Sequence, residues 1–129
     1  MTPRPLLPSA TMSATLYWYS GCSTCKQAHK HLAGLGVQPT LVELKTDPPS
    51  AATLADLHAR SGLPLKSFFN TAGQSYRNGG FKDRLPGLST AEQYDALAAD
   101  GMLVKRPILD LGHTVLVGFA APAYDEATS

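Results

Sequence analysis

The sequence predicts an α/β fold in which a small mixed sheet is flanked by helices. Two observations lead to this prediction. A strand, a helix and a second strand follow one another between Ala14 and Leu44, and two short strands joined by a tight turn lie near the C-terminal end. The 129 residues fit one domain, and 43% hydrophobic with 16% charged residues is an ordinary globular composition.

The first three elements follow from local patterns. The segment Ala14–Ser20 is rich in β-branched and aromatic residues, which predicts a buried strand that ends at Gly21. The segment Gln38–Leu44 alternates and predicts a second strand. Between them, Thr24–Gly34 is predicted to be a helix, because apolar residues recur at helical spacing: Cys25, Ala28, Leu32 and Leu35.

The middle of the chain is predicted to be helical. Ser50 is a plausible N-cap for a helix that continues to Ser61. Residues 70–80 contain three glycines, which favour turns or short helical pieces over one long helix. Ser89 is followed three residues later by a Glu, and this capping box predicts a helix over Thr90–Asp100.

The two ends of the chain are predicted to differ. Ile108–Asp110 and Thr114–Val117 are expected to form a hairpin, followed by a short polar end over Ala121–Ser129. Residues 1–13 carry three prolines in the first eight positions, so we expect a flexible extension before a domain at 14–129. Met12 lies directly before the first ordered element and is an alternative start.

Charge and hydropathy exclude several classes of protein. The net charge of +1 argues against a main role in direct nucleic-acid binding. No apolar run reaches the length of a membrane span, and the N-terminal segment lacks the apolar core of a signal peptide. We therefore expect a cytoplasmic protein, and in that compartment a close cysteine pair is more often catalytic or redox-sensing than structural.

The chemistry is predicted to lie in a CxxC motif at the start of the first helix. Cys22 is expected to have the lower pKa and to be the nucleophile, because helix N-termini stabilise a thiolate. Cys25 lies one turn further and is expected to resolve an adduct on Cys22. Ser23 and Thr24 are small and leave backbone donors open to an anionic substrate, and Lys26 adds positive charge.

Two other interpretations of the cysteines remain open. They are either two small core residues that happen to be close, or the beginning of a metal site with His29 on the same helix face. A zinc site needs a fourth ligand that the sequence does not obviously supply, so we expect no metal and no cofactor. The other histidines are expected to be solvent-facing or turn residues: His31, His58 and His113.

Four motifs together resemble the ArsC/Spx family, and within it the small arsenate-reductase-related proteins of bacteria. The resemblance covers about residues 14–120. The motifs are Cys22-Ser-Thr-Cys25, Leu63–Arg77, Gly101–Leu109 and Val115–Phe119. The resemblance implies a thioredoxin-like fold with a helical insertion between strands two and three.

The resemblance also implies roles for Arg106 and Pro107. Pro107 would be a cis-proline that faces the active-site cysteine, and Arg106 would lie beside that cysteine. A guanidinium there favours an oxyanion and lowers the pKa of a neighbouring thiol. Without the resemblance, a surface salt bridge is an equally good interpretation of Arg106.

The sequence departs from the arginine pattern of the arsenate reductases. These enzymes hold arsenate with three arginines, and the second and third correspond to Asn70 and to the segment Val117-Gly118-Phe119. The reductases with that arginine set lack the second cysteine and rely on glutathione or glutaredoxin, whereas this chain has Cys25. Arg77 or Lys105 are candidates to compensate. We expect arsenate reduction to be weak.

Two functions are therefore predicted. The first is a thiol-dependent oxidoreductase with an unidentified substrate, re-reduced by glutathione, glutaredoxin or thioredoxin. The second is a redox-sensing regulator of the Spx type that binds the RNA polymerase α subunit, although the C-terminal helix expected of that branch would be short or missing. A domain that keeps the fold without activity is a third interpretation.

Overall fold

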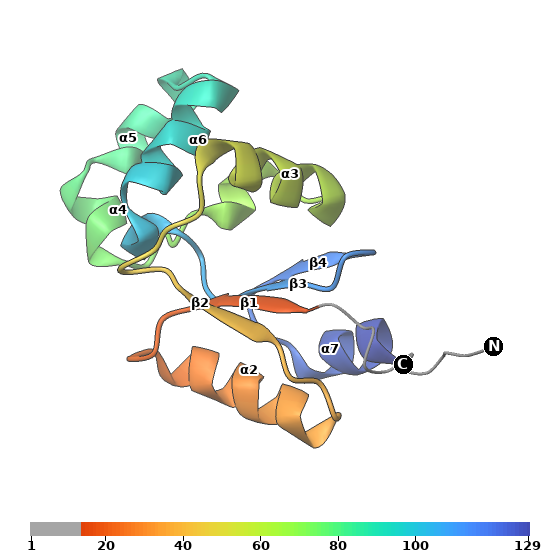
Figure 1. The fold of residues 1–129 in the computed structure, drawn as a ribbon. Helices are drawn as coiled ribbons and strands as arrows, with labels where there is room; N and C mark the ends of the chain where they lie inside the picture. The colour runs from red at the N-terminus through yellow and green to blue at the C-terminus, as the bar shows by residue number, and fades with distance from the viewer. Residues whose placement is uncertain (1–13) are drawn as a thin grey trace.

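The sheet has the expected mixed topology. The computed structural model describes residues 14–129, and it contains a four-stranded sheet in the order β2-β1-β3-β4 (Figure 1). Strands β1 (Thr15–Trp18) and β2 (Thr40–Glu43) are parallel, whereas β3 (Ile108–Asp110) is antiparallel to both β1 and β4 (Val115–Val117). Each strand lies within its predicted segment and is shorter by up to three residues, an ordinary difference at element ends.

Helices cover both faces of the sheet. Helix α2 (Ser23–Gly34) and helix α7 (Ala121–Thr128) lie on one face (Figure 1). The core on this side joins residues from three parts of the chain, because Leu16 of β1, Leu32 of α2 and Tyr124 of α7 are all fully buried in one cluster. This layering, with the helical insertion between β2 and β3, is the thioredoxin-like fold that the resemblance implies.

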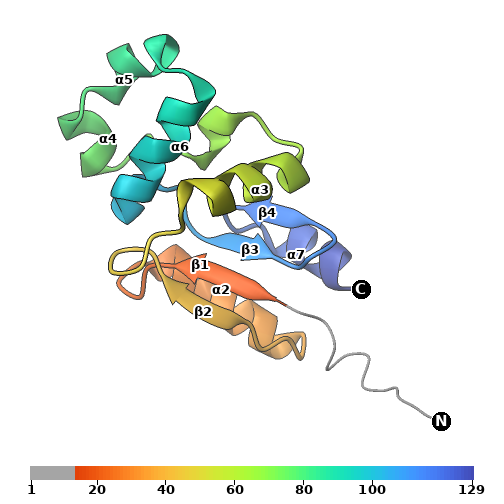
Figure 2. The same cartoon turned by 45° about the horizontal axis from the view of Figure 1, so that its top comes forward.

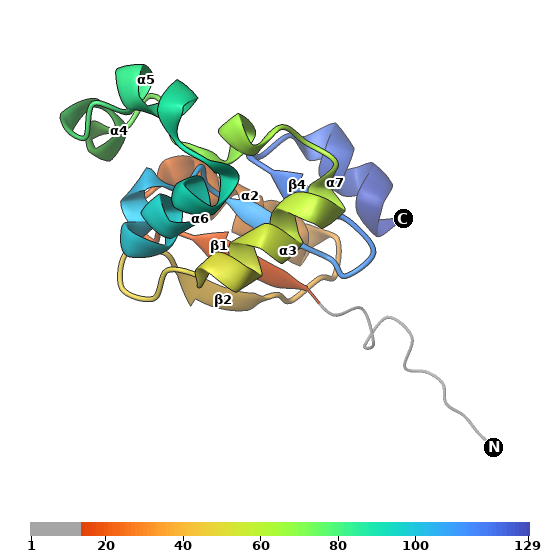
Figure 3. The same ribbon diagram turned by 90° about the horizontal axis from the view of Figure 1, so that it is seen from above.

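The helical insertion lies over the opposite face. Helices α3 (Ala51–Ser61) and α6 (Thr90–Ala99) pack on the sheet, and Figures 2 and 3 show α4 (Gln74–Asn78) and α5 (Phe81–Arg84) extending beyond it. The second core cluster lies between these helices and the sheet. It includes the fully buried residues Leu54, Leu57, Phe68, Leu97 and Ile108.

Both predicted caps are present. The Ser50 hydroxyl accepts a hydrogen bond from the backbone N–H of Thr53 at 3.1 Å. Ser89 and Glu92 form the full capping box, in which each side chain accepts a hydrogen bond from the other residue's backbone N–H, at 3.1 and 2.8 Å. These caps satisfy backbone donors that have no partner inside the helix, and so fix where α3 and α6 begin.

The predicted polar end is wrong. Residues Ala121–Thr128 form α7, and Tyr124 is fully buried against α2 and the sheet. The sequence gives a weak signal here because the helix has one large apolar side chain. The helix covers the apolar side of α2, so its stability comes from tertiary packing and not from its own composition.

Leu35 is more exposed, and His31 and His58 are less exposed, than the helical pattern indicates. Leu35 follows α2 and is 39% exposed, outside the buried set of Cys25, Ala28 and Leu32. His31 is partly buried and lies 2.7 Å from the Asp125 carboxylate, which joins α2 to α7. His58 is partly buried and lies 2.7 Å from the Tyr94 hydroxyl, which joins α3 to α6.

Helix α3 is fixed to the sheet by an ion pair that the sequence does not reveal. Arg60 donates to both carboxylate oxygens of Asp110 in β3, at 2.6 and 3.0 Å, and to Asp56 one turn earlier. The hydrogen bonds from the Arg60 guanidinium hold the pKa of Asp110 below its usual range despite partial burial. Bidentate pairs of this kind add geometric specificity to attraction.

The flexible extension predicted for residues 1–13, including Met12, lies outside the described residues. None of the helices in the described part of the chain has the length and hydrophobicity needed to span a lipid bilayer.

Gly101 allows the end of β2 to approach the segment that leads to the candidate site. It is buried at the start of the short 3-10 helix η3 (Gly101–Leu103), and a Cβ built there would collide with the backbone carbonyl of Leu44. The Leu44 carbonyl belongs to the backbone and cannot move aside as a side chain can. Gly101 therefore sets where the chain enters β3.

We predict that Gly101→Ala lowers the free energy of unfolding by about 1–3 kcal/mol, the usual cost of overpacking a closed site. Gly87→Ala is the matched control, because a Cβ at that position meets nothing within 4 Å. Urea unfolding of both variants measures the difference. Equal free energies of unfolding for the two variants would show that the segment at Gly101 and the end of β2 can move apart without cost.

Candidate active site

Cys22 is itself the N-cap of α2. Its backbone is extended, its N–H donates to the Tyr19 carbonyl at 2.9 Å, and its carbonyl accepts the N–H of Lys26 at 3.1 Å. The helix proper begins at Ser23, so the cysteine sulfur takes the place that a capping hydroxyl usually takes. The free N–H groups of the first turn are thereby available to a thiolate.

The surroundings of Cys22 lower the pKa of its thiol. Burial by itself would raise this pKa, but hydrogen bonds to the sulfur outweigh that effect. The donors are the Cys25 N–H, the Cys25 thiol, the Arg106 guanidinium and the Thr24 N–H. Cys22 therefore has more thiolate at neutral pH than an ordinary cysteine, which is what a sulfur nucleophile needs.

Cys25 has the opposite character. It lies one turn into α2, is fully buried, and its sulfur accepts the N–H of Tyr19 at 3.5 Å. Burial raises its pKa to about 12, and the hydrogen bond and negative charge of Cys22 contribute in the same direction. Both cysteines are free. The pair consists of one partly exposed thiol with a lowered pKa and one buried thiol with a raised pKa.

Arg106 lies beside Cys22, as the resemblance implies. The peptide bond from Arg106 to Pro107 is cis. The guanidinium lies over the ring of Tyr19, 5.3 Å from its centroid, and Nη1 donates to the Met102 carbonyl at 3.4 Å. Within residues 14–129, its buried Nε has no hydrogen-bond partner. This arginine is thus held by a ring and one carbonyl rather than by a surface carboxylate.

A cavity of about 430 Å³ opens next to the Cys22 sulfur. Its walls come from the start of α2, the segment after Phe69, the chain before Pro107 and the end of β4. Among the predicted site residues, Cys22, Thr24 and Arg106 line it, whereas Ser23, Cys25 and Pro107 do not. Ser23 is exposed beside it, and Cys25 and Pro107 are buried behind it.

The two positions that lack an arginine are both part of this cavity. Asn70 and Gly118 line its wall. Lys105 lines it as well, but Arg77 does not, because its Nη1 donates to the Ala72 carbonyl at 2.7 Å. In the described residues, the cavity therefore offers one guanidinium and one ammonium group to an anion.

Sequence reasoning missed Tyr19. Its backbone holds both cysteines through the hydrogen bonds already described, and its ring supports Arg106. The ring also fills the space over Gly21, where a Cβ would lie 2.8 Å from Cζ of Tyr19. The signal in the sequence is this glycine directly before the CxxC motif, which marks a close approach rather than only a strand end.

Tyr124 was missed too, and it fixes the far wall of the cavity. Its hydroxyl donates to the carbonyl of Gly118 at 3.2 Å, and the N–H of Gly118 donates to the carbonyl of Pro107 at 2.7 Å. A buried tyrosine in the C-terminal helix is thereby linked to the wall that faces Cys22. No local pattern indicates a link between α7 and the cysteine.

The structure gives His29 a packing role. Its ring lies edge-on to Trp18, with 5.2 Å between centroids. Among residues 14–129, no group of three or more His, Cys, Asp or Glu side chains is arranged to hold a metal ion.

Comparison with known proteins places this site in a family. The family model of the ArsC family matches residues 17–127. The uncharacterized protein YusI of Bacillus subtilis is 44% identical over 115 residues, which cover 89% of this chain and 98% of that protein. An arsenate reductase of Rhizobium meliloti is 30% identical over 98 residues, 76% of this chain and 69% of that protein.

A solved structure agrees with this match. A protein of Bacteroides fragilis related to the ArsC family is 36% identical and superposes with a TM-score of 0.86, over 92% of this chain and 98% of that one. The cis Arg106–Pro107 bond, the cysteine at the helix start and the helical insertion are the features that the resemblance had implied. The chain belongs to the ArsC family.

Proposed function

We propose that this protein reduces a disulfide, with Cys22 as the nucleophile and Cys25 as the resolving thiol. The family supports thiol-dependent redox chemistry in general. The observation that carries the finer proposal is the contrast between the two sulfurs, one with a lowered pKa in an open cavity and one buried with a raised pKa.

The first step is attack of the Cys22 thiolate on one sulfur of the substrate disulfide. The substrate S–S bond breaks, a new S–S bond joins Cys22 to one half, and the other half leaves as a thiolate that takes a proton from water. The Cys25 N–H, the Thr24 N–H and Arg106 stabilise the attacking thiolate. Ser23, Thr24 and Pro107 are proposed to position the substrate around it.

The second step is attack of Cys25 on the Cys22 sulfur. Cys25 loses its proton, the mixed disulfide breaks, and the second half of the substrate leaves as a thiol. Two electrons have then passed to the substrate, and the protein holds a Cys22–Cys25 disulfide. Burial is the largest cause of the raised pKa of Cys25, but the charge of Cys22 contributes and disappears once Cys22 is bonded, which eases this proton loss.

The cycle closes when an external thiol reduces the Cys22–Cys25 disulfide. We propose glutathione, glutaredoxin or thioredoxin for this step, and the reducing cytoplasm as the compartment. The alternative of a regulator that binds the RNA polymerase α subunit shares the cysteine pair and Arg106. The cavity beside Cys22 favours turnover, because binding a protein partner does not require a hollow at the sulfur.

Single-cysteine variants test the proposal. With a small disulfide and excess dithiol, we expect Cys22→Ser to lose turnover entirely. When the dithiol is left out, reduced Cys25→Ser should react once with the disulfide and stop as a mixed disulfide, visible as an added mass on Cys22, because no second thiol resolves it. Turnover in Cys22→Ser would contradict the assignment of the nucleophile.

The pH dependence of alkylation tests how Cys22 is activated. Iodoacetamide should modify Cys22 before Cys25, and its rate should reach half of its maximum at a lower pH than for a free cysteine, because only the thiolate reacts. We expect Tyr19→Leu to slow alkylation at neutral pH by about two- to fivefold, since Arg106 loses a cation–π contact.

Tyr19→Phe is the matched control, because it keeps the ring. If Tyr19 had only a structural role, Tyr19→Leu would lower the free energy of unfolding and leave the pH profile of alkylation unchanged. An unchanged profile in Tyr19→Leu would therefore exclude the ring as a support for Arg106.

Arsenate reduction is expected to be weak. Each charge-assisted hydrogen bond to a buried oxyanion contributes roughly 1.5–3 kcal/mol, so two missing arginines lower binding by about 10²–10⁴-fold. The test compares the rates at which the protein reduces arsenate and a small disulfide in the presence of the same reductant. Efficient turnover at micromolar arsenate would show that Lys105 replaces the guanidinium groups.

A further inference from the structure

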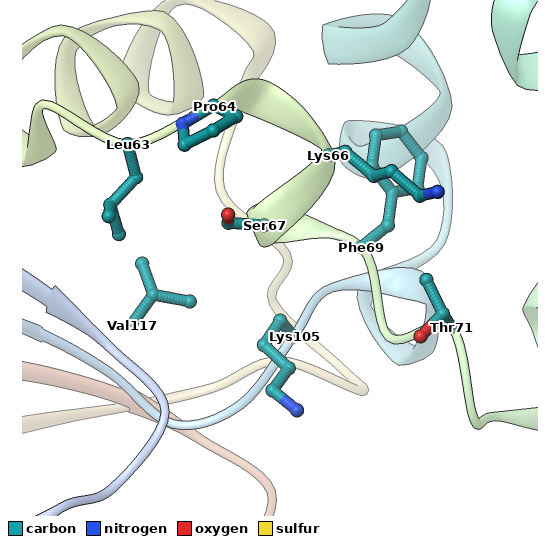
Figure 4. Close-up of a pocket in the computed structure, with 8 residues that line it drawn as sticks. All are labelled: Leu63, Pro64, Lys66, Ser67, Phe69, Thr71, Lys105 and Val117. Atoms are coloured by element: carbon teal, nitrogen blue, oxygen red, sulfur yellow. The ribbon is translucent and has the colours of Figure 1, made fainter.

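Two more hollows continue from the cysteine cavity, the first directly and the second through the first. The first has a volume of about 590 Å³ and shares Lys105 and Val117 with that cavity (Figure 4). The second has a volume of about 320 Å³ and shares Lys66 with the first. Through these shared residues the three hollows connect Cys22 to Lys82 in α5, and together we call them the basic track.

The charges of the basic track are all of one sign. Its lining includes four cationic side chains: Lys66, Lys82, Lys105 and Arg106. Within the described residues that line it, there is no Asp or Glu. The whole chain has 11 basic and 10 acidic residues, so this separation of charge is a property of the fold and not of the composition.

Apolar side chains lie between the cations. Figure 4 shows Leu63 and Val117 pointing toward one another across the middle hollow, with Lys66 and Lys105 on its other sides. The outer hollow continues this mixture with Tyr76 and Leu85. A surface of this kind fits a ligand that carries apolar groups and several negative charges along its length.

We infer that the basic track binds an acidic segment of a partner protein whose disulfide reacts with Cys22. This inference rests on the proposed function. A small acidic thiol at Cys22 would extend no further than the middle hollow. It would therefore not contact Lys82, which lines the outer hollow. A nucleic acid is the less favoured polyanion, because the net charge of +1 and the apolar walls give little to hold a phosphate backbone.

The chemistry at Cys22 is the same as with any disulfide. The Cys22 thiolate breaks the S–S bond of the partner, Cys25 then releases the partner as a thiol, and both electrons come from the cysteine pair. The basic track affects only how long the partner stays bound and how it is oriented during the reaction. Its contribution is electrostatic, so it should weaken as salt is added.

A synthetic peptide tests the inference. Its single cysteine is joined by a disulfide to thionitrobenzoate, and glutamates stand at least three positions from that cysteine; the matched peptide has glutamine there. Reduced protein releases coloured thionitrobenzoate from each peptide. We expect the glutamate peptide to react about three- to tenfold faster at low salt, with the difference lost at high salt.

Charge reversal then locates the effect. Lys66 is exposed and lines both the middle and the outer hollow, so Lys66→Glu should remove the preference for the glutamate peptide. Lys30→Glu is the matched control, because it makes the same change of charge on α2, outside the track. The glutamine peptide should react equally with the unchanged protein and Lys30→Glu, and for Lys66→Glu the measured quantity is the ratio of the glutamate-peptide rate to the glutamine-peptide rate.

Four outcomes would overturn the inference. They are equal rates for both peptides, a preference that survives Lys66→Glu, an equal preference for a third peptide whose only glutamate is next to the cysteine, and stronger competition by an added oligonucleotide than by an added glutamate peptide without cysteine. A protein that reacts with neither peptide would remove the proposed function and the inference with it.

Discussion

The site depends on a cysteine sulfur at the first turn of a helix, where the surrounding groups lower the pKa of its thiol. A negative charge in a half-buried position is unfavourable unless donors replace the water that it loses. Helix α2 supplies two backbone N–H groups without a partner of their own, and Arg106 brings the opposite charge from the other end of the chain. Because Cys22 is the cap residue, its sulfur lies where these donors converge, and the other features of the site support this arrangement.

The two cysteines differ because their sulfurs lie at different depths, although the residues are only one helix turn apart. Cys22 is at the end of α2 and borders a cavity, whereas Cys25 faces the core and is fully buried. The backbone of Tyr19 forms hydrogen bonds with both cysteines, so the turn between β1 and α2 determines how deeply each sulfur lies. The same motif with both sulfurs exposed would not shift the pKa values of the two thiols in opposite directions.

The surroundings of the cysteines bear on which substrates suit the site. The cavity wall has Asn70 and Gly118, at positions where the resemblance to arsenate reductases would imply arginine, and Lys105 lines both this cavity and the next hollow. Positive charge therefore continues away from the sulfur instead of surrounding it. Such a distribution favours a reacting group that is itself uncharged, such as a disulfide, on a partner that is acidic elsewhere.

Local patterns in the sequence determined much of the fold. The strands, the helix caps at Ser50 and Ser89 and the position of the CxxC motif were predictable, because each depends on residues within a few positions of one another. The resemblance to a family added the cis bond before Pro107 and the place of Arg106, which composition alone does not indicate.

Only the tertiary structure decided the rest. The burial of Tyr124, the ring of Tyr19 beneath Arg106 and the ion pair of Arg60 with Asp110 join residues that are far apart in the chain. The cavity beside Cys22 and the two hollows that continue from it likewise arise from segments that meet only after folding. A sequence pattern carries no signal for such contacts, because their energy comes from the approach of surfaces and not from the order of residues along one element.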